Sequence, residues 1–175
     1  MKPVFRTLLL AGFSLALGAG ESEPSPFYVQ VRVDQPLLAL KDQVGNRVGT
    51  GGSMGYTFYQ RPSRGLFMEV DFRIDGDHFE NKSLKTSAEG VGMGPELTMY
   101  FNSKPQGFYL NVAYAYQHWA LTAAGTEDAR TRLAGAIGLG YRFEKGFSLE
   151  ARYHGVQVDE RTRIGSLALG FGARF

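Results

Sequence analysis

Several features that define other classes of protein are missing from this sequence of 175 residues. It has no cysteine, which excludes a disulfide scaffold and thiolate metal sites, and it has only three scattered histidines. The formal net charge is only +2, and no basic patch with interleaved aromatic residues is present. Beyond the N-terminus, no apolar run approaches the roughly twenty residues that a membrane-spanning helix needs. We therefore expect no metal site, no cofactor, no nucleic-acid partner and no helical membrane span.

The N-terminal segment has the regions of a secretory signal peptide. Two basic residues precede an apolar run over residues 8–17, and small residues follow it. We predict a signal peptide over residues 1–20, cleaved after Gly18 or Gly20, and then a short polar lead-in over residues 21–26. The alternative is an N-terminal anchor, but the apolar run is only about half the length of a spanning helix.

From Phe27 onward, apolar and polar residues alternate with a period of two, which predicts strands. The predicted strands cover residues 27–39, 46–60, 66–79, 86–101, 107–121, 129–143, 147–158 and 163–175. Three connections, "RPSRG", "NSKPQG" and "EKG", have the composition of tight hairpins, and the others, including residues 41–45 and 122–128, are polar loops. Because closure removes the exposed edges of such a meander, we predict an all-β fold: an eight-stranded antiparallel up-and-down transmembrane β-barrel over residues 27–175.

The glycines indicate which face of the barrel is inside. They are concentrated on the charged positions of the strands, for example Gly138 and Gly140, where they would make room for long side chains in a narrow lumen. We therefore predict that the charged face lines the lumen and the apolar face meets lipid. The opposite arrangement, a soluble lipocalin-type carrier, is the alternative.

Tyrosine and phenylalanine collect near the tight turns, as in the aromatic girdle of a membrane interface. We assign Trp119 and Tyr116 to the opposite girdle. The strand directions then place the tight turns and both termini in the periplasm and the charged loops outside the cell. At the outer rim, Asp75, Asp77 and Glu80 could meet divalent cations.

Charges sealed in a narrow lumen have to be paired, so we predict a network of ion pairs that plugs the barrel. Its predicted members are Arg32, Glu69, Asp71, Arg73, Glu96, Arg130, Arg132, Arg142, Glu150, Arg152 and Arg174. Within this network we expect Glu150 to lie near Arg142 and Arg174. Acids on adjacent strands could instead form a catalytic acid/base pair, which we keep as an alternative.

The last strand, "IGSLALGFGARF", alternates apolar residues up to a terminal phenylalanine. Together with the signal peptide, the alternating strands and "GYRFEKGFSLEARY", it resembles the small eight-stranded outer-membrane β-barrels of Gram-negative bacteria, the OmpA- and OmpX-like porin-type superfamily. The resemblance implies a monomer in the bacterial outer membrane, in contact with its lipid and with lipopolysaccharide. It also implies that Phe171 and Phe175 form the signal for the barrel-assembly machinery.

We expect an integral outer-membrane barrel with a plugged lumen and a structural or surface-interaction role, and not an enzyme. Two alternatives are a narrow diffusion channel and a lipid A-modifying enzyme. Some eight-stranded relatives remove acyl chains from lipid A with a His-x-Ser-Asn run, but here His154 is followed by Gly155, Val156 and Gln157, and it falls on a lumen position. His118 falls on the lipid face, where we expect a structural role.

Overall fold

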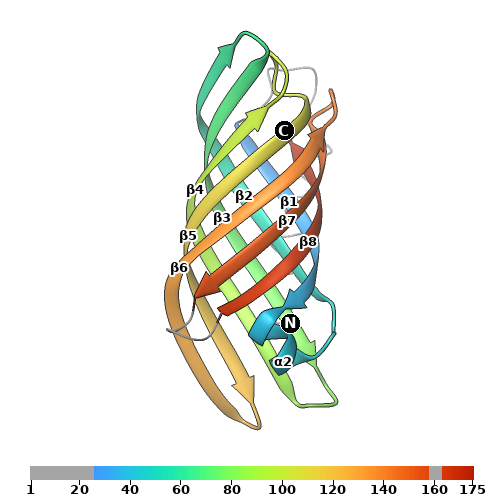
Figure 1. Cartoon of the computed structure of the whole chain (residues 1–175), viewed down its shortest axis with the longest axis vertical. Coiled ribbons are helices and arrows are strands. Elements are labelled where there is room, and N and C mark those ends of the chain that lie inside the picture. Colours follow the sequence, from blue (N-terminus) through green and yellow to red (C-terminus); the bar gives the residue numbers. More distant parts are fainter. Residues whose placement is uncertain (1–25, 158–162) are drawn as a thin grey trace.

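The computed structural model describes residues 26–157 and 163–175, and in it eight antiparallel strands form a closed barrel in sequential order (Figure 1). The strands are β1 (Phe27–Leu37), β2 (Gly49–Ser63), β3 (Leu66–Asn81), β4 (Thr86–Tyr100), β5 (Gly107–Ala123), β6 (Thr126–Arg142), β7 (Phe147–Gln157) and β8 (Arg163–Arg174). β8 closes the barrel by pairing with β1. The predicted fold class is therefore confirmed.

Some predicted segments lie outside the described residues. These are the signal peptide, residues 21–25 of the lead-in, and the outer connection with residue 158, which was predicted to end the seventh strand. No helix among the described residues is long and apolar enough to cross a membrane. We call the end of the barrel with the C-terminus and the tight turns the periplasmic end, after the predicted orientation, and the opposite end the outer end (Figure 1).

The two faces of each strand lie as predicted. On β3, Phe72 and Ile74 point outward and are 44% and 39% exposed, whereas their neighbours Asp71 and Arg73 point inward and are buried. A barrel with an apolar outer wall and a charged interior has the polarity that a hydrocarbon environment requires.

Lumen glycines make room for large side chains on the neighbouring strands. A β-carbon at Gly140 would overlap the ring of Tyr109, and one at Gly138 would overlap the amide of Asn111. By contrast, a β-carbon at Gly135, on the outer wall of the same strand, would meet nothing within 4 Å. The predicted use of glycine inside the barrel is confirmed at these positions.

The connection between β1 and β2 is not the polar loop predicted for residues 41–45. It contains a short helix, α2 (Leu38–Val44), which lies at the outer end of the barrel (Figure 1). Leu40 and Val44, four residues apart and so on one face of the helix, are fully buried in a cluster with residues of the lumen wall. Gly45 ends the helix with a φ of 68°, which favours glycine. A helix of seven residues, only two of them buried, is too short to give a recognisable period in the sequence.

Trp119 belongs to this cap and not to an outer girdle. It is 6% exposed, faces inward, and packs on Phe79 with the ring centroids 6.4 Å apart. Tyr116, in contrast, points outward and is 70% exposed. Trp119, Phe79, Leu40 and Val44 are part of an apolar layer that we call the outer cap.

We expect Leu40→Ala to loosen the outer cap without opening the barrel wall, because Leu40 is fully buried there but forms none of the strand pairs. Trp119 is the only tryptophan, so its fluorescence emission should shift to longer wavelength and its quenching by acrylamide should increase. Lys41→Ala, at an exposed position of α2, is the matched control and should leave both signals unchanged. Equal spectra for the two variants would contradict the packing of α2 on Trp119.

β5 and β6 extend into residues 122–128, which were predicted to form a loop. Both strands extend to a tight turn at Ala124 and Gly125, whose φ angles are 50° and 84°. Such a pair of left-handed residues is typical of a two-residue hairpin turn. The pairing of β6 with β7 begins only at Ala134, so the hairpin projects from the outer end (Figure 1).

Candidate functional site

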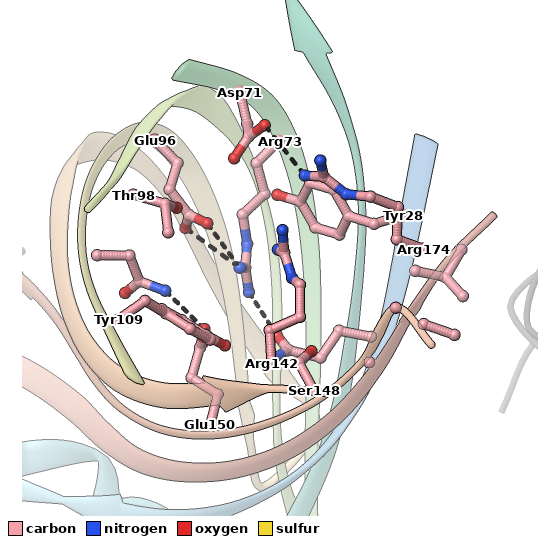
Figure 2. Close-up of a pocket in the computed structure, with 16 residues that line it drawn as sticks. Tyr28, Asp71, Arg73, Glu96, Thr98, Tyr109, Arg142, Ser148, Glu150 and Arg174 are labelled. Carbon is pink, nitrogen blue, oxygen red and sulfur yellow. Dashed lines mark hydrogen bonds and ion pairs between the residues drawn. The ribbon is translucent and has the colours of Figure 1, made fainter. Parts of the chain in front are cut away.

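The lumen is crossed at mid-height by a carboxylate between two guanidinium groups. Glu96 on β4 accepts from Arg73 on β3 at 3.2 Å and from Arg152 on β7 at 2.5 Å, through the same oxygen. β3 and β7 face each other across an eight-stranded barrel, so Glu96 joins opposite walls. Figure 2 shows Arg73 and Glu96 pointing toward one another inside the barrel.

Glu69 is the centre of a second group nearer the periplasmic end. Its buried carboxylate lies 2.7 Å from Arg174 and 3.0 Å from Arg142, and it accepts a hydrogen bond of 2.8 Å from the hydroxyl of Tyr100. Asp71, on the same face of β3, accepts from Thr57 and lies 3.9 Å from Arg174. Four strands other than β3 therefore contribute to this group: β2, β4, β6 and β8.

Glu150, Arg142 and Arg174 line one cavity, as predicted, but the expected pairing is wrong, because both arginines pair with Glu69 and Glu150 pairs with Arg152 at 3.3 Å. In the register, Glu150 is opposite Gly140, as expected for a position diagonal to Arg142. Its carboxylate, however, accepts from Tyr109 at 2.9 Å and from Asn111 at 2.6 Å, both on β5. These two side chains reach across β6 because Gly140 and Gly138 occupy the intervening positions.

A third group, formed around Arg32, lies nearer the outer end. Arg32 on β1 donates to Asp75 at 2.7 Å and to Asp77 at 2.5 Å, both on β3. Asp75 also accepts from Arg73 at 2.8 Å, which connects this group to the central one. The two aspartates are 8% and 5% exposed, so the prediction that they meet cations at the outer rim is wrong. Arg32 binds them inside the barrel instead.

Arg130 and Arg132 are not in the enclosed lumen. They lie on the inward-facing positions of β6, but within the hairpin that projects beyond the last pair with β7, Ala134–Val156. Arg130 forms an ion pair of 3.1 Å with Asp128 on the same strand, and Arg132 is exposed. The predicted parity was correct for both residues. In this part of β6, however, the described residues form strand pairs only with β5.

The remaining space in the lumen is small. A cavity beside Arg73, Glu96 and Tyr28 has a volume of about 20 Å³ (Figure 2), and a second one beside Arg152 and His154 also has about 20 Å³. A volume of this size holds about one water molecule. Paired side chains line both cavities, and the outer cap lies at the outer end of the lumen.

The two terminal aromatic residues predicted as an assembly signal lie at the barrel seam. Phe171 points outward and stacks on Phe147, with the ring centroids 5.7 Å apart. Phe175 continues the pairing of β8 with β1, because its backbone N–H donates to the carbonyl of Phe27 at 3.2 Å. Their recognition by an assembly machinery stays a prediction.

This closed barrel with an apolar outer wall matches a known family over nearly its whole length. The model of the outer membrane protein beta-barrel domain covers residues 5–175. The chain belongs to this family. The location of this outer-membrane barrel in the bacterial outer membrane follows from its membership, and the predicted resemblance to small eight-stranded barrels is confirmed. No curated protein matches its sequence.

Solved structures share the fold at low sequence identity. The N-terminal β-barrel domain of Pseudomonas aeruginosa OprF is 17% identical, with a TM-score of 0.52, over 87% of this chain and 100% of that one. Neisserial surface protein A is also 17% identical, with a TM-score of 0.53, over 88% and 100%. The outer membrane enzyme PagL is 10% identical, with a TM-score of 0.61, over 85% and 99%. At these identities the similarity extends to the fold and not to the function.

Proposed function

We propose that this outer-membrane barrel is a closed, non-conducting structural protein that holds its outer hairpins at the cell surface. The observation that supports the proposal most directly is the chain of buried ion pairs from Arg32 through Asp75, Arg73 and Glu96 to Arg152. It connects β1, β3, β4 and β7 across the lumen, and the cavities beside it hold about one water molecule each.

The energetics of buried charges support a lumen that stays closed. Removing one partner of a buried ion pair leaves an uncompensated charge and costs about 3–5 kcal/mol. In this barrel several such pairs share their partners, so a water path along the axis would require the loss of more than one at a time. The outer cap adds an apolar barrier at the outer end.

We also propose that the barrel is not a lipid A-modifying enzyme. His154 is buried in the lumen beside guanidinium groups, where a lipid acyl chain has no access. His118 is on the outer wall, and its Nδ1 lies 3.0 Å from the hydroxyl of Thr131. Neither histidine therefore stands with a serine on the lipid face, the arrangement expected of a lipid A deacylase. The projecting β5–β6 hairpin favours surface interaction as the barrel's contribution.

We expect no persistent open currents when the mature protein is inserted into planar lipid bilayers at neutral pH. Insertion can be verified on the same sample by the mobility difference between heated and unheated protein in a gel and by the resistance of the barrel to protease. Stable conductance steps from barrels that pass both checks would contradict the closed lumen and favour the diffusion channel. Their absence in barrels that pass both checks is the expected result.

A further inference from the structure

The outer wall of the barrel is hollowed on the side formed by β6, β7 and β8. A groove with a volume of about 710 Å³ runs over these strands and reaches β1 and β5. Its floor is Ala151 on β7, which is paired with Leu139 on one side and with Leu169 on the other. Leu149 and Tyr153 are the next outward residues of β7. Ala151 has the smallest outward side chain in the lining, and the larger side chains of Leu139, Leu149 and Leu169 surround it.

A second hollow continues the groove to the periplasmic end. It has a volume of about 610 Å³ and shares Tyr141 and Phe171 with the groove. Lys145, in the tight turn between β6 and β7, is one of its lining residues. Glu144, its neighbour in the turn, lines the hollow as well. The combined surface, which we call the wall groove, thus has an apolar floor within the membrane and one ammonium and one carboxylate group at its periplasmic end.

The charge at this end of the barrel has one dominant sign. Arg64 lies in the turn between β2 and β3, Lys104 in the turn between β4 and β5, and Lys145 in the turn between β6 and β7. All three side chains are exposed. A rim of this kind attracts anionic headgroups, and each basic residue near a charged membrane surface adds to the attraction.

We propose that the wall groove binds an anionic phospholipid of the periplasmic leaflet. One acyl chain lies over Ala151 between Leu139 and Leu169, and the phosphate group contacts the ammonium of Lys145. The inference rests on membership of the outer-membrane family and on the predicted orientation, and it does not depend on whether the lumen conducts.

The surroundings of the groove favour a lipid over a second copy of the chain. In a bilayer the acyl chains are as apolar as leucine, so an apolar wall gains little from contact with another apolar wall unless the shapes match closely. A flexible acyl chain can adapt its shape to a shallow groove, whereas a second barrel would need a protruding surface that matches it. The three tight turns at this end carry Arg64, Lys104 and Lys145 against one acid, Glu144. This mainly basic rim complements a phosphate and not the equally basic rim of a second barrel.

The experiment is native mass spectrometry of the mature protein in detergent with added phosphatidylglycerol or phosphatidylcholine. We expect the wild-type protein to keep one phosphatidylglycerol molecule under collisional activation that removes the others. Ala151→Phe, which fills the floor, should lose this molecule. Lys145→Gln should lower the preference for phosphatidylglycerol over phosphatidylcholine by about fivefold, the effect of one basic residue near the membrane surface.

The matched control for Ala151→Phe is Val70→Phe. Val70 is the fifth residue of β3 and Ala151 the fifth of β7, and both strands run in the same direction, so the two positions lie at similar depth on opposite walls. Lys104→Gln is the control for Lys145→Gln. Both controls should keep the lipid and its headgroup preference. Ala151→Leu replaces Ala151→Phe if the larger side chain prevents folding, with the same expected loss.

Two results would overturn the proposal. The first is equal lipid retention by the wild-type protein and a folded Ala151 variant. The second is a wild-type dimer that the Ala151 variant dissociates, which would assign the wall groove to a second copy. Because neither measurement involves conductance, the outcome is separate from the test of the closed lumen.

Discussion

Glu69→Gln should lower the free energy of unfolding by about 3–5 kcal/mol, the cost of removing one partner from a buried ion pair. The Glu69 side chain is 0% exposed and is paired with the guanidinium groups of Arg142 and Arg174. A glutamine keeps the shape of the side chain but not its charge, so Arg142 loses its ion-pair partner and Arg174 keeps only Asp71, at 3.9 Å. Urea unfolding of the barrel in lipid vesicles, followed by the loss of the unheated gel mobility, measures the effect.

Glu89→Gln is the control for this prediction. Glu89 is also on a strand and near a potential partner, His78, but its side chain is 57% exposed. Loss of a charge from such an exposed pair changes stability by about 1 kcal/mol or less. If both variants unfolded at the same urea concentration, the lumen pairs would contribute no more than surface pairs, and the argument for a persistently closed lumen would fail.

Gly140→Val should destabilise the barrel by about 3 kcal/mol, the upper part of the range for overpacking. Its β-carbon would overlap the ring of Tyr109 and would lie 2.7 Å from the backbone carbonyl oxygen of Leu149. The ring cannot move aside without losing the hydrogen bond from its hydroxyl to Glu150. The same unfolding measurement in vesicles applies.

Gly135→Val is an internal reference on the same strand. A β-carbon at Gly135 meets nothing within 4 Å, and the position is on the outer wall, where a valine is in a favourable environment. We expect its stability to be unchanged or slightly increased. A similar loss for both variants would mean that the cost comes from replacing a glycine in β6 and not from the overlap with Tyr109, against the packing described here.

The sequence predicted the strands and their two faces because alternation is a local property. Asp71 and Phe72 are neighbours in the chain, and their opposite environments follow from the period of two alone. It also predicted most members of the lumen network, since every long charged residue on an inward position of an enclosed strand has to find a partner. Arg73 and Glu96 are examples, at 3.2 Å from each other.

The choice of partners could not be predicted in the same way. Glu69 and Arg174 are 105 residues apart, and their contact depends on the stagger of the strands around the barrel. Glu150 accepts hydrogen bonds from Tyr109 and Asn111 because two glycines on the intervening strand leave space for these side chains. A rule that considers only pairs of neighbouring strands does not predict such a contact.

The limits of the enclosed lumen were equally hidden. Arg130 has the correct parity for the lumen, but among the described residues β6 pairs with β7 only from Ala134 onward, and the position of this pairing cannot be read from the sequence around Arg130. The helix α2 is a similar case, because Leu40 becomes a buried residue only when Phe79 and Trp119 are brought beneath it by strands far along the chain.

The seam between β1 and β8 has a consequence for the order of folding. Every other strand pair joins consecutive segments of the chain, whereas the seam pairs Tyr28 with Arg174. The entropy lost on closing a loop grows with its length, so the seam is expected to form last. Arg32 and Arg174 lie on the two strands of the seam and form ion pairs with acids on β3. The last strand pair and these ion pairs are therefore expected to form together. A seam closed in a shifted register would leave these arginines without acidic partners. The correct register is therefore more stable than the shifted ones.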